Sequence, residues 1–357
     1  MTSRPIPSLD GLRAVSVLLV IFSHMGLEAV VPGGFGVTVF FFLSGFLITT
    51  LMRTEYDAAG SVNLRNFWFR RALRILPPFY LVLAVCTGAS LLIDPPGTLS
   101  AGAVVAQVLH YTNYWIVWNG YSGQAPGTGV YWSLAVEEHF YLLFPWLYVA
   151  LRKLRLSGRN QALLLWGICA AVLLWRCVLV RSFDVPEDRT YLATDTRVDA
   201  ILFGCALAVW HNPVVAANDY PERLWKYFLL PTAVAILLGS LVYRDPGFRE
   251  TFRYSLQGMA LTVVFMASIR FHDKFPFRLL NLRPVIFLGV LSYSLYLVHY
   301  PLIFAVKRLV PDWPGVVQAC LAGALSFSAS WAIYRFVEKP CARLRKKFSP
   351  RASPLTA

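Results

Sequence analysis

An arginine and a histidine near the start of the chain have the types and the spacing that chemistry would need. Arg13 and His24 lie 11 residues apart in the apolar stretch LDGLRAVSVLLVIFSHMGL. A helix turns about 100° per residue, so both side chains would project from one face, roughly 16 Å apart along the axis. Ionisable side chains inside a membrane helix are costly and mark candidate functional sites. The alternative is a snorkelling arginine and a histidine that bonds a neighbouring carbonyl.

Two adjacent glutamates lie in the segment YWSLAVEEHFYLLFP. Glu137 is six residues past the start of this apolar segment, about 9 Å along a helix, which is a depth close to that of His24. A carboxylate beside a histidine fixes its tautomer and raises its basicity. We therefore favour an acid–base pair of His24 and Glu137 over a structural pair that joins two helices. Spacing alone does not choose between Glu137 and Glu138, which point about 100° apart.

A third group is the arginine cluster in FWFRRALRILPPFY, with Arg70, Arg71 and Arg74. Arg71 and Arg74 are three residues apart and share a helix face. Guanidinium groups suit phosphate oxygens, although ordinary topology-setting charge would look the same. Because Arg13 opens to the same predicted side, we expect a phosphorylated cytosolic donor here.

Weaker candidates lie further along the chain. Arg197 stands at the entry of an apolar segment, and His299 in LSYSLYLVHYPL comes just before Pro301. A helix loses a backbone hydrogen bond at proline, so His299 either contacts substrate or satisfies that kink. Arg176 and Asp199 are expected to form structural pairs. We find no P-loop and no metal-ligand spacing, and we expect no metal and no permanently bound cofactor.

The elements that position these residues follow from composition. Of the 357 residues, 57% are hydrophobic and 15% are charged, against roughly 45–50% and about 25% in soluble proteins. A soluble enzyme and a disordered chain are therefore excluded. The apolar runs are continuous and long enough to cross a bilayer as helices, which predicts an all-α polytopic integral membrane protein. The net charge of +14 then indicates orientation and not nucleic-acid binding.

Eleven segments are apolar enough to be candidate spans. They are Leu9–Val30, Gly36–Met52, Ile75–Ile93, Ala101–Trp118, Tyr131–Leu151, Ala162–Val180, Thr194–Trp210, Lys226–Tyr243, Tyr254–Ile269, Pro284–Val306 and Gly315–Phe336.

The basic residues decide which candidates cross the membrane, because basic loops stay in the cytoplasm. All the basic loops lie on one side only if Ala101–Trp118, the most polar candidate, does not cross. We predict that this segment is re-entrant or interfacial and packed on protein. About ten transmembrane helices remain, with both termini cytoplasmic. We expect a transmembrane domain over residues 1–340, a basic cytoplasmic tail over 341–357, and a multi-pass location in a bacterial cytoplasmic membrane.

The motifs together resemble the membrane-bound acyltransferase-3 family of O-acyltransferases. The matches are SLDGLRAVSVLLVIFSH, VFFFLSGFLIT, FRRALRILPPFY, WSLAVEEHFYLLFPW and YSLYLVHYPL, in the family's order. The resemblance implies a ten-span domain that transfers an acyl group, often acetyl, from acyl-CoA to a hydroxyl of a sugar or glycosylated acceptor. The family's Arg-x10-His and RxxR motifs fall on Arg13 with His24 and on Arg71 with Arg74. Its W-S-L-x-x-E pattern selects Glu137, and His139 replaces a common glutamine.

These observations combine into one hypothesis of mechanism. Arg71 and Arg74, with Arg13, would hold the phosphates of acyl-CoA, and Glu137 would orient His24. His24 would deprotonate the acceptor hydroxyl or be acylated itself. Weaker substrate contacts are expected from Glu138, His139, Arg197, Tyr293 and His299. The acceptor would be a glycan or a glycosylated, macrolide-type molecule, and the partners would be the bilayer and acyl-CoA, with no nucleic acid. The alternative is a transporter or flippase of a glycan or lipid-linked sugar.

Overall fold

Helices make up nearly all of the computed structural model, which describes residues 4–215, 221–348 and 355–356. The first part contains α1 (Leu9–Phe22), the π-helical turn η1 (Ser23–Leu27), α2 (Gly33–Ala59), α3 (Leu64–Ile93), α4 (Ala101–Val108), α5 (Thr112–Asn119), the 3-10 turn η2 (Thr128–Tyr131), α6 (Trp132–Lys153), α7 (Gly158–Ser182), α8 (Glu187–Leu192) and α9 (Thr194–Val209). The second part contains α10 (Glu222–Leu224), η3 (Trp225–Leu229), α11 (Leu230–Val242), α12 (Pro246–Glu250), α13 (Phe252–Arg270), η4 (Phe277–Asn281), α14 (Arg283–Leu309), α15 (Gly315–Ile333), η5 (Tyr334–Glu338) and α16 (Lys339–Lys346).

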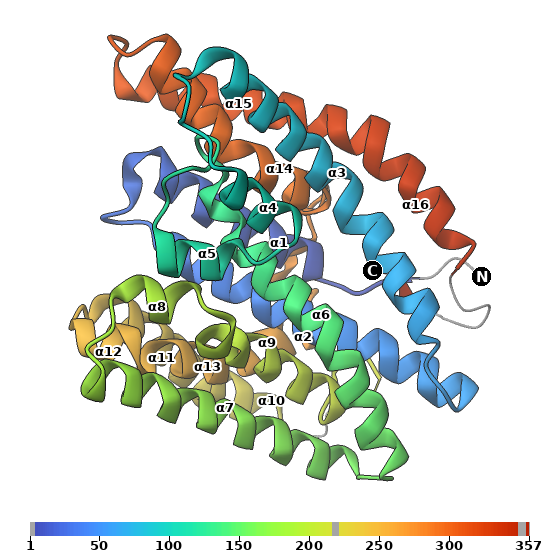
Figure 1. The fold of residues 1–357 in the computed structure, drawn as a ribbon. Coiled ribbons are helices and arrows are strands. Elements are labelled where there is room, and N and C mark those ends of the chain that lie inside the picture. Colours follow the sequence, from blue (N-terminus) through green and yellow to red (C-terminus); the bar gives the residue numbers. More distant parts are fainter. Residues whose placement is uncertain (1–3, 216–220, 349–354, 357) are drawn as a thin grey trace.

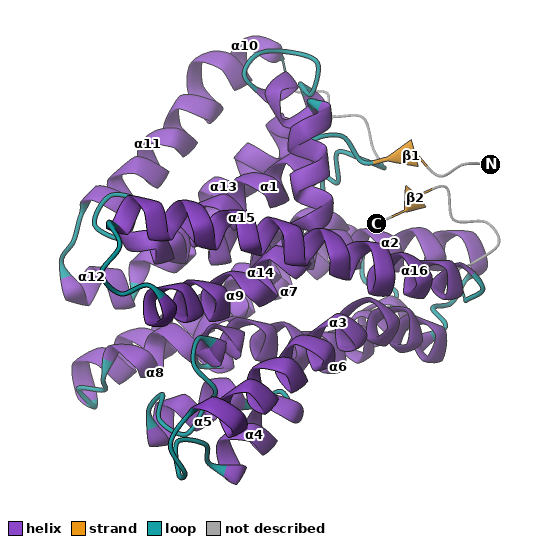
Figure 2. Cartoon of the chain, turned by 90° about the horizontal axis from the view of Figure 1, so that it is seen from above, coloured by secondary structure: helices purple, strands orange, loops and turns teal. Residues whose placement is uncertain are grey.

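Two short strands bring the ends of the chain together. β1 (Arg4–Pro5) pairs in parallel with β2 (Leu355–Thr356), with Arg4 opposite Leu355. Figure 2 shows the two strands side by side next to the marked N and C ends. Both ends therefore lie on the same side of the bundle, as the charge pattern requires. Their location in the cytoplasm stays a prediction.

Seven helical segments among the described residues are long and apolar enough to span a membrane. They are Leu9–Leu27, Gly33–Ala59, Leu64–Ile93, Gly158–Ser182, Glu222–Val242, Arg283–Leu309 and Gly315–Lys346. The other three predicted spans form α6, α9 and α13, of 22, 16 and 19 residues. The protein is thus an all-helical, polytopic membrane protein, and the count of ten spans stays a prediction.

The segment Ala101–Trp118 does not form a spanning helix. It folds as α4 and α5, each of 8 residues and so only about 12 Å long, against a hydrocarbon core of about 30 Å. Its polar side chains are buried against protein. Gln107 Nε2 donates to Thr128 Oγ1 at 2.7 Å, and Asn113 Nδ2 donates to Thr194 Oγ1 at 3.0 Å. This confirms that the segment packs on protein instead of crossing as one helix.

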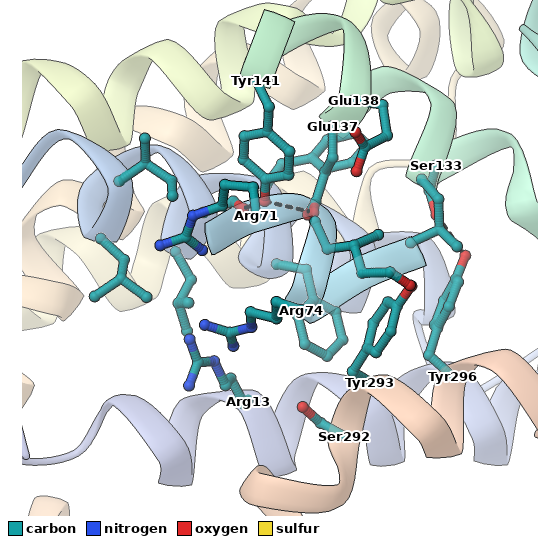
Figure 3. Close-up of a pocket in the computed structure, with 18 of the residues that line it drawn as sticks. Arg13, Arg71, Arg74, Ser133, Glu137, Glu138, Tyr141, Ser292, Tyr293 and Tyr296 are labelled. Atoms are coloured by element: carbon teal, nitrogen blue, oxygen red, sulfur yellow. Dashed lines mark hydrogen bonds between the residues drawn. The ribbon is translucent and has the colours of Figure 1, made fainter. Parts of the chain in front are cut away.

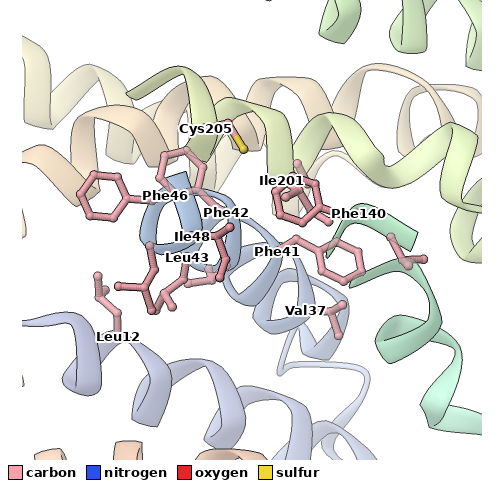
Figure 4. Packing of buried hydrophobic residues seen from close by; sticks show 14 of the residues in the cluster. Leu12, Val37, Phe41, Phe42, Leu43, Phe46, Ile48, Phe140, Ile201 and Cys205 are labelled. Carbon is pink, nitrogen blue, oxygen red and sulfur yellow. The ribbon is translucent and has the colours of Figure 1, made fainter. Parts of the chain in front are cut away.

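The core of the bundle is built around α2. In the most apolar stretch of α2, 83% of the residues are buried. Figure 1 shows α2 between two groups of helices, one running from α7 to α13 and the other formed by α3, α14, α15 and α16. Figure 4 shows Phe42 and Phe46 of α2 beside Ile201 and Cys205 of α9. Because lipid tails are as apolar as these side chains, close packing must supply much of the attraction between the helices.

Glycines let the central helices approach to backbone contact. A Cβ at Gly45 of α2 would lie 2.0 Å from the carbonyl oxygen of Ile201, and one at Gly204 of α9 would lie 2.0 Å from that of Phe42. The two glycines thus face the opposite helix from both sides of one interface. Small residues in this arrangement are typical of tight helix pairs in membranes.

We predict that Gly204→Ala destabilises the protein, because the added methyl group meets the backbone of α2, which cannot rotate away. Overpacking of this kind costs about 1–3 kcal/mol. Gly167→Ala in α7 is the matched control, since nothing lies within 4 Å of its Cβ position and alanine is the better helix former. Thermal unfolding in detergent should show a lower Tm for Gly204→Ala alone. Equal Tm values for both variants would contradict the tight α2–α9 contact.

Candidate functional site

Three cavities follow one another along α1, and neighbouring cavities share lining residues. The Arg345 cavity, of about 230 Å³, is lined among others by Asp10, Arg13, Arg74, Ser292, Tyr293, Glu338, Lys339 and Arg345. The Arg71 cavity, of about 90 Å³, is lined by Arg13, Val37, Ser44, Arg71, Arg74, Ser133, Glu137, Glu138, Tyr141, Ser292, Tyr293 and Tyr296 with apolar residues of α2 and α3. The His24 cavity, of about 570 Å³, contains His24, Val37, Gln124, Trp132, Tyr191, Tyr296 and Tyr300.

The three arginines singled out in the sequence meet in the Arg71 cavity. Figure 3 shows the guanidinium groups of Arg13, Arg71 and Arg74 gathered on one side of it. Arg13 Nη1 pairs with Asp10 Oδ1 at 2.8 Å. Among the described residues, neither Arg71 nor Arg74 has a salt bridge, and Arg74 Nη1 is buried without a hydrogen-bond partner. Gathered guanidinium groups, two of which have no salt bridge among the described residues, suit an anionic ligand.

The neighbouring Arg70 has a different role. Its Nη2 forms a salt bridge with Glu55 Oε2 at 2.8 Å, and the Glu55 side chain is only 8% exposed. Its Nη1 donates to the carbonyl oxygen of Phe348. Arg70 therefore joins α3 to α2 and to the segment that follows α16, whereas Arg71 and Arg74 line the cavity.

The pairing expected between Glu137 and His24 is not the one that the structure makes. Glu137 Oε2 accepts a hydrogen bond from the Tyr141 hydroxyl at 2.8 Å, and that hydroxyl also bonds Ser44. Glu137 lines the Arg71 cavity, while His24 lines the next cavity. Counting residues along each helix predicted similar depths, but depth does not fix the direction in which a side chain points around the helix axis.

Glu138 and Tyr293 also line the Arg71 cavity, and the Tyr293 hydroxyl donates to the carbonyl oxygen of Ile75 at 2.8 Å. His139 lies elsewhere. Its Nδ1 is 2.7 Å from Thr194 Oγ1 at the start of α9, and its ring packs against Tyr114 of α5. Of these three predicted contacts, two reach the cavity, while His139 joins α6 to α9.

His24 is paired with His299. Its Nδ1 lies 2.9 Å from Nε2 of His299, and the two rings are stacked with centroids 5.2 Å apart. His24 lies in the π-helical turn η1 that extends α1, a feature common at functional sites. His299 lies on α14 and is 0% exposed. The structure thus brings together two residues that the sequence left in separate motifs.

The hydrogen bonds of His299 determine which nitrogen of each ring carries the proton. Its Nδ1 lies 2.7 Å from the carbonyl oxygen of Tyr296, which can only accept, so Nδ1 donates. In an uncharged ring, Nε2 of His299 must then accept, and His24 donates to it from Nδ1. Nε2 of His24 therefore keeps its lone pair, and the His24 side chain lines the His24 cavity. That nitrogen is the one available as a base.

Tyr296 stands where the Arg71 and His24 cavities meet. It lines both, as does Val37, and its hydroxyl donates to the carbonyl oxygen of Val130 at 2.7 Å and lies 2.6 Å from Ser133 Oγ. Sequence reasoning missed Tyr296 and Tyr141. A signal was present, because Tyr296 is three residues before His299 and Tyr141 is four after Glu137, so that each shares a helix face with a residue already singled out.

Arg197 is fully buried beside the site. Its guanidinium carbon lies 3.8 Å from the centre of the Tyr254 ring and 5.3 Å from that of Tyr191, and Nη2 donates to Thr38 Oγ1 at 3.1 Å. The expected pairing of Arg176 with Asp199 is present, at 2.7 Å between Nη2 and Oδ2, with both side chains 0% exposed. Arg176 and Asp199 are therefore structural, while Arg197 supplies buried positive charge.

Comparison with known proteins identifies the family of the chain. A family model described as an acyltransferase domain matches residues 6–335. The chain belongs to the acyltransferase-3 family. Membership in this family agrees with the resemblance carried by the motifs of the sequence. No solved structure matches the chain.

Two bacterial relatives carry O-acetyltransferase names. “Putative O-acetyltransferase SACOL0978” of Staphylococcus aureus (strain COL) is 31% identical over 348 residues, which is 94% of this chain and 57% of the relative. “Peptidoglycan O-acetyltransferase OatA” of Listeria monocytogenes serovar 1/2a is 31% identical over 356 residues, which is 94% of this chain and 55% of the relative. The chain spans little more than half the length of these relatives.

We predict that His299→Phe lowers kcat about tenfold or more, because the partner that fixes the tautomer of His24 is lost, as with outer-shell partners of other functional histidines. His299→Gln should restore part of the rate, since its amide oxygen can accept from Nδ1 of His24. Steady-state acyl transfer by each purified variant, with Tm measured in parallel, makes the comparison. An unchanged kcat in folded His299→Phe would contradict a positioning role.

Proposed function

We propose that the protein transfers an acetyl or other short acyl group from acyl-CoA to a hydroxyl of a glycan or glycosylated acceptor. The observation that carries this proposal is the junction of two cavities. One contains the cluster of Arg13, Arg71 and Arg74, and the other contains His24, whose Nε2 has no hydrogen bond to any of the described residues. An anion-binding region joined to a base is what transfer from a phosphorylated donor requires.

The donor fits the order of the cavities. Acyl-CoA carries phosphates at one end and its thioester at the end of a long, thin arm. We assign the phosphates to Arg71 and Arg74, with Arg13 beside them, at the cytoplasmic end. The arm would pass Tyr296 and place the thioester near His24. Arg13 and His24 are separated by roughly 16 Å along a helix, which matches a ligand whose charged and reactive ends are far apart.

Transfer would then proceed by general-base catalysis. Nε2 of His24 removes the proton from the acceptor hydroxyl as its oxygen attacks the thioester carbon. The carbon–sulfur bond breaks, and the departing CoA thiolate takes the proton back from His24. A positioned base of this kind contributes typically about 10²–10⁴-fold in rate. In a variant of this scheme His24 itself is acylated first, which would let the donor and the acceptor bind at different times.

Glu137 takes a role other than orienting His24. It faces the same cavity as the arginines (Figure 3) and bonds the Tyr141 hydroxyl. We propose that Glu137 balances the arginine cluster and holds its geometry through Tyr141 and Ser44. Truncating Glu137 would then mainly weaken the binding of the donor. Truncating a residue that orients His24 would instead lower kcat.

The acceptor is assigned by analogy. The Listeria relative is named for peptidoglycan, so among the acceptors that the family allows we favour a bacterial cell-surface glycan over a macrolide. The protein would act in the bacterial cytoplasmic membrane, with ten spans and both termini in the cytoplasm. The Arg345 cavity would then open on the cytoplasmic side, and the His24 cavity would lie toward the outer side.

The deciding experiment uses purified protein in lipid nanodiscs, where both faces are accessible. Acetyl-CoA is the donor, and the disaccharide of N-acetylglucosamine and N-acetylmuramic acid is the acceptor. Mass spectrometry should detect a new acetyl ester, and His24→Ala should lower its rate at least about 100-fold. His272→Ala, an exposed histidine elsewhere, should match the wild type. A fully active, folded His24→Ala variant would overturn the mechanism, and an inactive wild type that responds to a proton gradient would favour transport.

A second experiment tests the donor site. Arg71→Gln should raise KM for acetyl-CoA about tenfold, because a charge-assisted contact to phosphate is lost, while kcat changes little. Arg65→Gln is the matched control, since it removes an exposed arginine from the first turns of the same helix. An unchanged KM for acetyl-CoA in Arg71→Gln would rule out its phosphate contact.

A further inference from the structure

A fourth cavity adjoins the His24 cavity on the side away from the arginine cluster. This Arg253 cavity, of about 780 Å³, lies between the α1–α2 connection and helices α11 to α13. Its charged lining residues are Glu28, Glu187, Arg244, Arg249 and Arg253. Four residues, Ser23, Gly33, Gly34 and Tyr191, line both this cavity and the His24 cavity. The two cavities are therefore adjacent, and His24 lines the second of them.

The arginines that line this cavity outnumber their carboxylate partners. Arg249 pairs with Glu187 at 3.2 Å between Nη2 and Oε1. Arg244 Nη2 donates to the carbonyl oxygen of Ala29 at 2.8 Å, and Arg253 Nη2 donates to the Tyr254 hydroxyl at 3.1 Å. Within the described chain, neither Arg244 nor Arg253 has a carboxylate partner. Even with Glu28 counted, the wall keeps a net positive charge.

More positive charge lies behind this wall. The Tyr254 ring, only 2% exposed, has Arg253 at 5.1 Å on the cavity side and the buried Arg197 at 3.8 Å. Nε and Nη1 of Arg197 have no hydrogen-bond partner among the residues that the structure describes, and its neighbour Asp199 is already paired with Arg176. A buried cation without a counter-charge is costly, and in a low dielectric it acts strongly on any charge nearby.

We infer that the Arg253 cavity binds an anionic group of the acceptor, a carboxylate or a phosphate, while the hydroxyl that is acylated reaches His24. The inference rests on the proposed function and names a class of acceptor. A glycan with one acidic substituent fits both cavities at once, because Tyr191 and Gly34 form their common wall. A Cβ at Gly34 would lie 3.0 Å from the Tyr191 hydroxyl, so a glycine here keeps that wall open.

The test compares acceptors that differ only in charge. The probes are the disaccharide of N-acetylglucosamine and N-acetylmuramic acid, and the methyl ester of the same disaccharide, with acetyl-CoA as donor and the full-length protein in nanodiscs. Arg253→Gln and Arg244→Gln should each raise KM for the acid about tenfold and leave KM for the ester and for acetyl-CoA unchanged. Arg181→Gln is the control, an exposed arginine at the end of α7 that does not line this cavity.

The outcomes separate this inference from the function on which it rests. If the wild type acetylates neither probe, the proposed function fails. If it acetylates both with the same KM, or if the arginine variants lose both probes equally, the transferase stands and the anionic acceptor is overturned. The nanodiscs are made once with phosphatidylcholine alone and once with added phosphatidylglycerol. Should the effect of Arg253→Gln appear only with the anionic lipid, the cavity binds a lipid headgroup, and the inference is again overturned.

Discussion

The contact between α1 and α14 is the constraint on which the site depends. A Cβ at Gly289 of α14 would lie 1.9 Å from the carbonyl oxygen of Asp10 on α1, so the two backbones touch where the helices first meet. From this contact the helices run together, and further along they hold His24 and His299 within 2.9 Å. They also contribute Arg13 and Tyr293 to the wall between the Arg345 and Arg71 cavities. Any residue larger than glycine at position 289 would therefore disturb the charged end and the histidine end together.

Along this pair of helices, the cluster of arginines and glutamates lies apart from the histidine pair. Arginines and glutamates gather in the Arg71 cavity, and the histidines gather beyond Tyr296. The separation has a physical use, because a carboxylate or a guanidinium beside His24 would change the protonation of its ring. The backbone carbonyl of Tyr296 instead fixes the tautomer through His299 without adding charge. In the proposed function, this uncharged contact would leave Nε2 of His24 available as a base, while the arginines of the Arg71 cavity would bind the anionic donor.

Much of this arrangement could be predicted from the sequence. The spacing of residues along the chain does not determine the rest, which depends on tertiary packing. Helical spacing was enough to place Arg13 and His24 on one helix and Arg71 with Arg74 on one face, since these depend on local geometry alone. The distribution of basic loops and the polarity of Ala101–Trp118 were enough to predict that this segment packs on protein, as Gln107 and Asn113 do. The partner of His24 was predicted wrongly, because the rotation of α6 about its axis depends on tertiary packing. The different roles of Arg70 and Arg71 could not be predicted for the same reason. Only the fold shows that Glu55 forms a salt bridge with Arg70 and leaves Arg71 to the cavity.

The unpaired arginines explain why the fold tolerates costly groups. A buried guanidinium without a carboxylate partner destabilises a membrane protein unless another interaction compensates for its lost hydration. Arg70 and Arg176 have such partners in Glu55 and Asp199, and both act as links between helices. In the part of the chain that the structure describes, Arg74 and Arg197 keep buried nitrogens without hydrogen-bond partners. Arg74 lines the Arg71 cavity, and Arg197 lies against Tyr191 of the His24 cavity. In the proposed function, the anionic donor would meet the positive charge of the Arg71 cavity, and the anionic acceptor would meet the positive charge around Tyr191 and Tyr254. Both cavities share lining residues with the cavity of His24.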